Sequence, residues 1–102
     1  MSHSPGQVYR WFDRPAGLLV VLSAEDSNRD IGRVTVCPFN LTDMVGNLPQ
    51  AARLHSLLPS PGYIAWTLHF TLIAGLLTEH VGEVETAPLF AARFALEGHF
   101  GF

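Results

Sequence analysis

The feature that most constrains the fold is an unbroken run of five apolar residues, Leu18 to Leu22, which stands between Gly17 and Ser23. A strand with one face in water alternates apolar and polar side chains, so this run predicts a strand buried on both faces. The chain must therefore supply cover for both sides of the strand. Because 48% of its 102 residues are hydrophobic and only 15% are charged, it can do so as a single domain, residues 1–102.

Other segments have the composition or the alternation of strands. They are Gln7 to Phe12, Arg33 to Phe39, Gly62 to Phe70 and a short segment from His80 to Val84. The segment from Gly62 to Phe70 alternates most regularly, so we expect one continuous strand there, with His69 on its polar face. The polar stretch from Ala24 to Gly32 is expected to be an irregular link within a hairpin. Between residues 40 and 60 we predict only a short strand or helix near residues 50–58.

The C-terminal segment has the signals of a helix. Thr86 is suited to the N-cap, Pro88 to the first turn and Gly98 to the stop, with helix formers from Leu89 to Leu96 between them. We therefore expect a mainly β fold, a small half-open antiparallel β-barrel closed by a C-terminal α-helix. Residues 1–6 are expected to be disordered, and residues 98–102 to form a short tail.

Charge and titratable residues narrow the possible functions. The net charge is −3, from nine acidic residues against six arginines, a balance that does not favour nucleic-acid binding. Four of the arginines are nevertheless in the first third of the chain, so an anion-binding surface is expected there: Arg10, Arg14, Arg29 and Arg33. The five histidines lack the close pairing of zinc sites, so we predict no metal and no cofactor. The single cysteine, Cys37, is expected to be a small core residue.

The hydropathy pattern contains neither a membrane-spanning segment nor a secretory signal, which indicates where the protein is located. The longest apolar stretch, Ile64 to Leu77, is interrupted by polar residues and is shorter than the roughly 18 to 20 residues that span a bilayer. The first residues have neither the basic start nor the apolar stretch of a secretory signal. We expect a cytoplasmic protein that does not enter a membrane.

The order of motifs resembles the MazF/PemK toxins of the MazF and CcdB superfamily. An apolar strand, a small acidic stretch and an asparagine-arginine pair run from Leu19 to Arg29, and another strand follows from Val34 to Phe39. The segment from Leu77 to Val84 is similar to the family's segment before its terminal helix. The resemblance implies an SH3-like barrel, a homodimer, a cognate antitoxin and metal-independent cleavage of single-stranded messenger RNA.

The family's catalytic arginine and threonine are missing at the matching positions. Ala16-Gly17 and Asn40 stand there instead. As substitutes we consider Arg14 in the same turn, Thr42 after Asn40, and His69, which would supply a cation, a hydroxyl and a proton acceptor. Asn40 and Arg29 are the expected substrate-binding residues.

Two alternatives remain open. The chain ends in His99, Phe100, Gly101 and Phe102, which resembles the aromatic-glycine-aliphatic tail of CcdB, a non-enzymatic poison of DNA gyrase. That resemblance implies that the tail is the partner-binding element. The missing catalytic residues also fit a toxin fold that has lost its activity and only binds partners.

Overall fold

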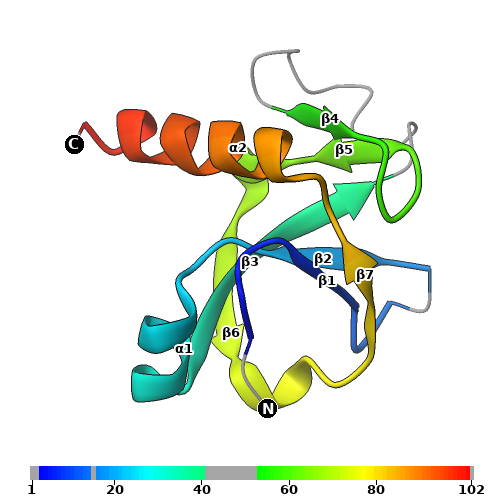
Figure 1. Cartoon of the computed structure of the whole chain (residues 1–102). Helices are drawn as coiled ribbons and strands as arrows, with labels where there is room; N and C mark the ends of the chain where they lie inside the picture. The colour runs from blue at the N-terminus through cyan, green and yellow to red at the C-terminus, as the bar shows by residue number, and fades with distance from the viewer. Residues whose placement is uncertain (1–2, 15, 41–52, 102) are drawn as a thin grey trace.

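A computed structural model describes residues 3–14, 16–40 and 53–101 (Figure 1). The strands in these residues are β1 (Gln7–Arg10), β2 (Leu18–Val21), β3 (Arg33–Asn40), β4 (Leu54–Ser56), β5 (Gly62–Ile64), β6 (Phe70–Ile73) and β7 (His80–Glu83). The α-helices are α1 (Glu25–Ile31) and α2 (Thr86–His99). The expected fold class, a half-open antiparallel barrel with a C-terminal helix, is confirmed.

The strands form one curled antiparallel sheet in the order β4-β5-β3-β2-β1-β7, with β6 paired to β3 outside this path. Strand β3 is the longest and holds the sheet together. One of its edges pairs with β2, and the other pairs first with β6 and then with β5. The expected pairing of the second and third strands is therefore confirmed.

The prediction of one continuous strand from Gly62 to Phe70 is wrong. Strands β5 and β6 are separated by a 3-10 helix, Trp66–Leu68. Phe39 pairs with Ile64 and Val36 pairs with Phe70, so the five residues 65–69 face only the two residues 37–38 of β3. Regular alternation cannot continue across this mismatch, and Pro38 has no backbone N–H with which to extend the ladder.

The link between β2 and β3 also differs from the expected irregular loop, because it contains helix α1. Glu25 and Asp26 occupy the first turn and Arg29 the last, which suits the helix dipole. Gly32 ends the helix with φ 67°, the left-handed conformation that glycine adopts readily, and its N–H donates to Asn28 O. The polar composition of this segment concealed these helix signals.

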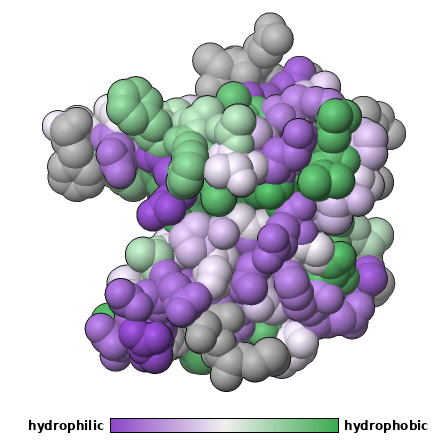
Figure 2. All heavy atoms as spheres, in the orientation of Figure 1, coloured by the Kyte–Doolittle hydropathy of each residue, from purple (hydrophilic) through white to green (hydrophobic). Residues whose placement is uncertain are grey.

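Helix α2 is longer than predicted at its C-terminal end. It begins at Thr86, with Glu85 rather than Thr86 at the N-cap, and runs through Gly98 to His99. The chain turns only at Gly101, where φ is 80°. Gly98 therefore lies inside the helix and does not end it. Phe90 and Phe94 of α2 are exposed. Figure 2 shows apolar side chains gathered on the outer surface of this helix.

Two apolar clusters lie on opposite faces of the sheet. The helix-side cluster, beneath α2, contains Val8, Val20, Leu22, Cys37, Phe39, Ile64, Trp66, Val84, Leu89 and Ala92. The barrel-side cluster contains Tyr9, Leu19, Val21, Val34, Val36, Leu72 and Leu77. Successive residues of β2 alternate between the two clusters, which confirms the prediction that this strand is buried on both faces.

The residues before β1 make several backbone contacts, although the sequence predicted disorder for residues 1–6. Gly6 N donates to Val21 O at 2.8 Å, and Gly6 O accepts from Val84 N at 2.9 Å. This segment therefore joins β2 to the strand that leads into α2. No helix in the described part of the chain is long and apolar enough to cross a membrane.

Candidate nucleic-acid interface

The turn between β1 and β2 holds Arg14 against an aromatic stack. The Arg14 Cζ atom lies 4.4 Å from the centroid of the Trp11 ring, and that ring stacks on Phe70 of β6 at 5.6 Å and 29°. Trp11 N donates to Gly17 O at 2.9 Å and Gly17 N donates to Arg14 O at 2.8 Å. The turn is tight at Gly17, where a Cβ atom would lie 3.1 Å from Trp11. This geometry orders a cation on a ring that is fixed from behind.

A second group of polar and aromatic side chains lies on β4 and β5. His55 pairs with Tyr63 across the two strands, and Tyr63 pairs with Asn40 at the end of β3. The Arg53 Cζ atom lies 4.6 Å from the centroid of the Tyr63 ring, and the His55 ring lies 5.2 Å from it, edge to face. Tyr63 therefore brings a cation and an imidazole to the same place.

Both groups share one face of the sheet. Tyr63 and His55 are each next in sequence to a residue of the helix-side face, Ile64 and Leu54 respectively, so they point the other way. Trp11 and Phe70 pack against the barrel-side cluster. Pairing of Leu19 with Pro38 brings the β1–β2 turn to the same end of the sheet as the end of β3.

This face, which we call the barrel-side face, has the chemistry of a single-stranded nucleic-acid interface. Arg14 and Arg53 supply positive charge, and the rings of Trp11 and Tyr63 supply flat surfaces on which bases can stack. The His55 imidazole supplies ring nitrogens that can form hydrogen bonds. Because the phosphates of a bound strand are neutralised locally, the overall charge of −3 does not decide whether this face binds RNA.

The structure does not bring His69 to Arg14. His69 lies between the 3-10 helix and β6, its Nδ1 donates to Trp66 O at 3.0 Å, and its ring contacts Phe100. It also lines a cleft with Leu22 and Leu96, on the helix-side face. The sheet thus separates His69 from the Arg14 stack. Its position relative to Thr42 is not defined, because Thr42 lies outside the described residues.

The remaining predicted residues fall in several places. Asn40 ends β3 and only its backbone is described, as the register partner of Tyr63. Arg29 lies on α1, next to the start of β3 and so at the opposite end of this strand from Asn40, and forms an exposed ion pair with Asp26 at 2.8 Å. The structure therefore does not bring Arg29 to the Arg14 and Tyr63 groups. His99 packs edge to face on Trp66 at 6.0 Å, and Phe100 packs on both His69 and His99; Gly101 follows them, and Phe102 is outside the described residues.

Sequence reasoning missed Trp11, Arg53, His55 and Tyr63 as site residues. Prolines at 59 and 61 interrupt the pattern, and β4 is only three residues long, so periodicity could not reveal it. The spacing of Arg53 and His55, two residues apart, was the available signal, because residues at i and i+2 share a face of a strand.

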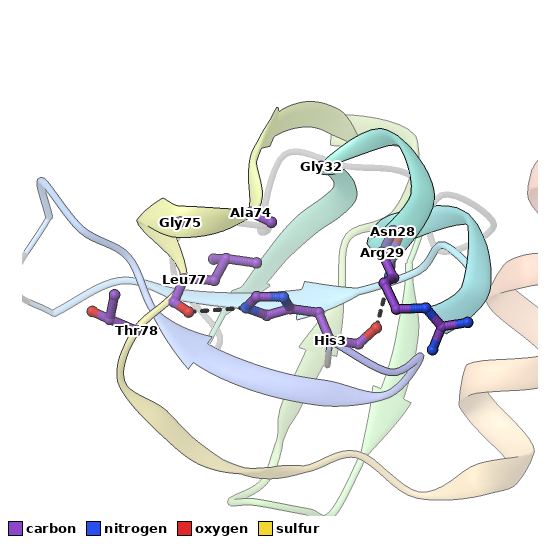
Figure 3. Close-up of a pocket in the computed structure, with 8 residues that line it drawn as sticks. All are labelled: His3, Asn28, Arg29, Gly32, Ala74, Gly75, Leu77 and Thr78. Carbon is purple, nitrogen blue, oxygen red and sulfur yellow. Dashed lines mark hydrogen bonds between the residues drawn. The ribbon is translucent and has the colours of Figure 1, made fainter. Parts of the chain in front are cut away.

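A second cleft, of about 410 Å³, lies between α1 and the segment before β7 (Figure 3). Its His3, Asn28 and Arg29 side chains already have partners within the protein. His3 Nε2 donates to Leu77 O at 3.0 Å, and the Asn28 side chain donates to His3 O at 2.8 Å. These bonds hold the N-terminal segment in place, so we assign this cleft no ligand. Among the described residues, no group of three or more His, Cys, Asp or Glu side chains is placed to hold a metal ion.

Comparison with known proteins finds similarity in structure. No family model matches the sequence, and no curated protein matches it. An endoribonuclease from a mycobacterial species superposes with a TM-score of 0.77 at 24% identity, over 97% of this chain and 91% of that one. An endoribonuclease in complex with its cognate antitoxin, also mycobacterial, gives 0.75 at 22% identity, over 97% and 93%. MazF from Deinococcus radiodurans gives 0.73 at 18% identity, over 97% and 96%. The chain therefore has the fold of the MazF endoribonucleases.

Proposed function

We propose that this protein is the toxin of a toxin-antitoxin pair and cleaves single-stranded RNA on its barrel-side face. The observation that supports this most directly is the position of His55 and Arg53 on Tyr63, on the same face as the Arg14–Trp11 stack. The fold shared with endoribonucleases supports the same function. A homodimer, a cognate antitoxin and a cytoplasmic location complete the proposal.

The chemistry requires no metal. His55 accepts the proton of a ribose 2′-hydroxyl, the 2′-oxygen forms a bond to phosphorus, and the bond from phosphorus to the 5′-oxygen breaks. A proton returns to the leaving 5′-oxygen, which gives a cyclic phosphate and a 5′-hydroxyl end. Arg53 and Arg14 neutralise the charge that develops on the phosphate oxygens. Asn40, the last residue of β3, and Thr42, which lies outside the described residues, remain proposed contacts to the substrate.

We assign proton transfer to His55 instead of His69 because His69 borders the opposite face of the sheet. The tail gives less support to gyrase poisoning than its sequence suggested. Helix α2 continues through Gly98, and the Phe100 ring packs on His69 at 5.5 Å. The described residues of the tail therefore do not form a free segment that presents two aromatic anchors to a partner.

The proposal is tested by incubating the purified protein with single-stranded RNA in EDTA and mapping new 5′ ends. We expect His55→Gln to slow cleavage by about 100-fold or more, the scale of general acid–base catalysis. Arg53→Gln should also slow it, whereas the exposed His80→Gln and the ion-paired Arg29→Gln serve as matched controls and should cut normally.

Three results would overturn parts of this proposal. Cleavage that His55→Gln leaves unchanged would remove His55 from the mechanism. RNA binding without cleavage would indicate a toxin fold that only binds partners. Growth arrest with intact RNA and trapped gyrase would transfer the function to the C-terminal tail.

A further inference from the structure

A cleft of about 330 Å³ lies on the helix-side face, between the end of α2 and strands β3 and β6. Figure 2 shows the molecule hollowed on this side, between α2 and α1. The cleft is separated by the sheet from the barrel-side face. Its volume is at the low end of the roughly 300 to 1,000 Å³ that small-molecule sites occupy.

One part of the cleft is apolar and contains aromatic rings. Leu22 and Leu96 line it, and Phe100 stands against His69 with ring centroids 5.5 Å apart and planes 81° apart. Phe100 is 54% exposed, so part of its ring remains accessible to a ligand. A flat apolar surface of this kind suits a planar aromatic group.

Another part of the cleft is polar. The Thr35 and Thr71 hydroxyls share one hydrogen bond, at 3.0 Å, so one of their two hydrogens remains available to a ligand. His69 donates from Nδ1 to Trp66 O, so Nε2 is the ring nitrogen left for a ligand, and the two threonine hydroxyl oxygens can also accept. The cleft therefore offers both a donor and an acceptor beside its aromatic wall, as recognition of a nucleobase edge requires.

Two arginines do not line the cleft but are close in the chain to residues that do. Arg33 is two residues before Thr35 on β3, so both residues project from the same face. Within the described part of the chain, the exposed Arg33 side chain forms no hydrogen bond or ion pair. Arg93 is seven residues before Phe100, on the same side of α2. An anionic group can thus be held next to the aromatic slot.

We propose that this cleft binds one nucleotide, with its base against Phe100 and its phosphate beside Arg33. The cleft supplies apolar and hydrogen-bonding groups, and Arg33 is two residues along β3 from its Thr35, which together match the groups that a nucleotide presents. The ligand is either a free nucleotide or one residue of a longer RNA strand, because both have this chemistry. The site is distinct from the cleavage site proposed above and does not depend on it.

The test is titration of the full-length protein with AMP, adenosine and inorganic phosphate, followed by NMR of the side chains. AMP should shift the ring signals of Phe100 and His69. It should also bind more tightly than adenosine or inorganic phosphate. Phe100→Ala should weaken AMP binding by about tenfold, the scale of losing one stacked base. Phe94→Ala, a 79% exposed phenylalanine on the same helix, is the matched control and should leave binding unchanged.

The phosphate contact has its own control. Arg33→Gln should remove the preference for AMP over adenosine, whereas Arg29→Gln, whose arginine already pairs with Asp26, should keep it. AMP-saturated protein is then titrated with an oligonucleotide that cannot be cleaved. This titration distinguishes a free nucleotide from one residue of an RNA strand as the ligand. Competition assigns the cleft to a residue of the RNA strand, and independent binding assigns it to a free nucleotide.

Two results would overturn the proposal. If AMP at millimolar concentration does not shift the ring signals of Phe100 and His69, the cleft does not bind nucleotides. Alternatively, Phe100→Ala could turn a dimer into a monomer in sedimentation without changing AMP affinity. A second copy of the chain would then be what covers this cleft. Neither result bears on RNA cleavage at His55, which is measured separately.

Discussion

The side-chain amide of Asn28 donates to the backbone oxygen of His3, which is 25 residues earlier in the chain, at 2.8 Å. The same Nδ2 donates to Ser23 O at 3.0 Å, and Oδ1 accepts a hydrogen bond from the Ser23 hydroxyl. Asn28 is only 2% exposed. The asparagine of the asparagine-arginine pair therefore has a structural role, since it joins α1, the end of β2 and the N-terminal segment.

Asn28→Ala should lower the free energy of unfolding by about 1 to 3 kcal/mol, because it leaves two backbone oxygens without their donor. Urea titration measures this loss. Ser27→Ala, at the exposed neighbouring position of α1, is the control and should change stability by less than about 0.5 kcal/mol. Equal stability of the two variants would contradict the structural role of Asn28.

The packing of β7 against the loop before β5 leads to a second prediction. A Cβ atom on Gly82 would lie 2.7 Å from Pro59 Cβ, which is closer than such atoms approach one another. Gly82→Ala should therefore destabilise the protein by about 1 to 3 kcal/mol, in the range of other overpacked sites. Thermal unfolding is the measurement.

Gly75→Ala is the matched control for that variant, because a Cβ at Gly75 meets nothing within 4 Å. It should leave the melting temperature unchanged or raise it slightly, since alanine reduces the freedom of the unfolded chain. If Gly82→Ala melts at the same temperature as Gly75→Ala, the contact between β7 and Pro59 is looser than described.

Local pattern was sufficient to predict β2, β7 and most of α2, where each residue's surroundings follow from its neighbours in sequence. The apolar run of β2 indicated burial on both faces, which the alternation of Leu19 and Val20 between the two clusters confirms. The split of β5 from β6 could not be predicted in this way. It arises from the register of both strands against β3, which is a relation between distant segments.

The candidate site was predicted less well for the same reason. Arg14 was selected from its turn, but the stack with Trp11 and Phe70 joins residues of β6 and the β1–β2 turn. His69 was placed on a polar face by an alternation that ends at the 3-10 helix. His55 was not selected at all, because its partner Tyr63 is identified only by the pairing of β4 with β5.

Arg14 should contribute to RNA affinity through charge. Arg14→Gln should weaken RNA binding and lower the slope of log affinity against log salt by about 0.7, the value for one phosphate contact on a single strand. Fluorescence anisotropy at several salt concentrations measures this slope. Arg29→Gln should keep the wild-type slope, and a similar decrease in both variants would indicate a diffuse charge effect without a defined Arg14 contact.

Burial of Cys37 predicts how stability depends on pH. The side chain is completely buried, and desolvation of the thiolate raises the pKa of the thiol far above its ordinary value. Above about pH 8.5 the thiol of the unfolded chain loses its proton while the folded chain keeps it. The unfolded state then binds fewer protons, so the free energy of unfolding must fall as the pH rises, by about 1.4 kcal/mol per pH unit. Urea titrations between pH 7 and pH 10 measure this decrease.

Cys37→Ala is the control for the pH series and should show a much flatter dependence up to about pH 10, where tyrosines begin to ionise. Burial also raises the pKa of Tyr9, so a further decrease above that pH is expected in both proteins. In the folded wild type, a thiol reagent should react with Cys37 only as fast as the protein opens, and urea should accelerate that reaction. Rapid labelling at neutral pH without urea, or the same decrease of stability in Cys37→Ala, would contradict the burial of this thiol.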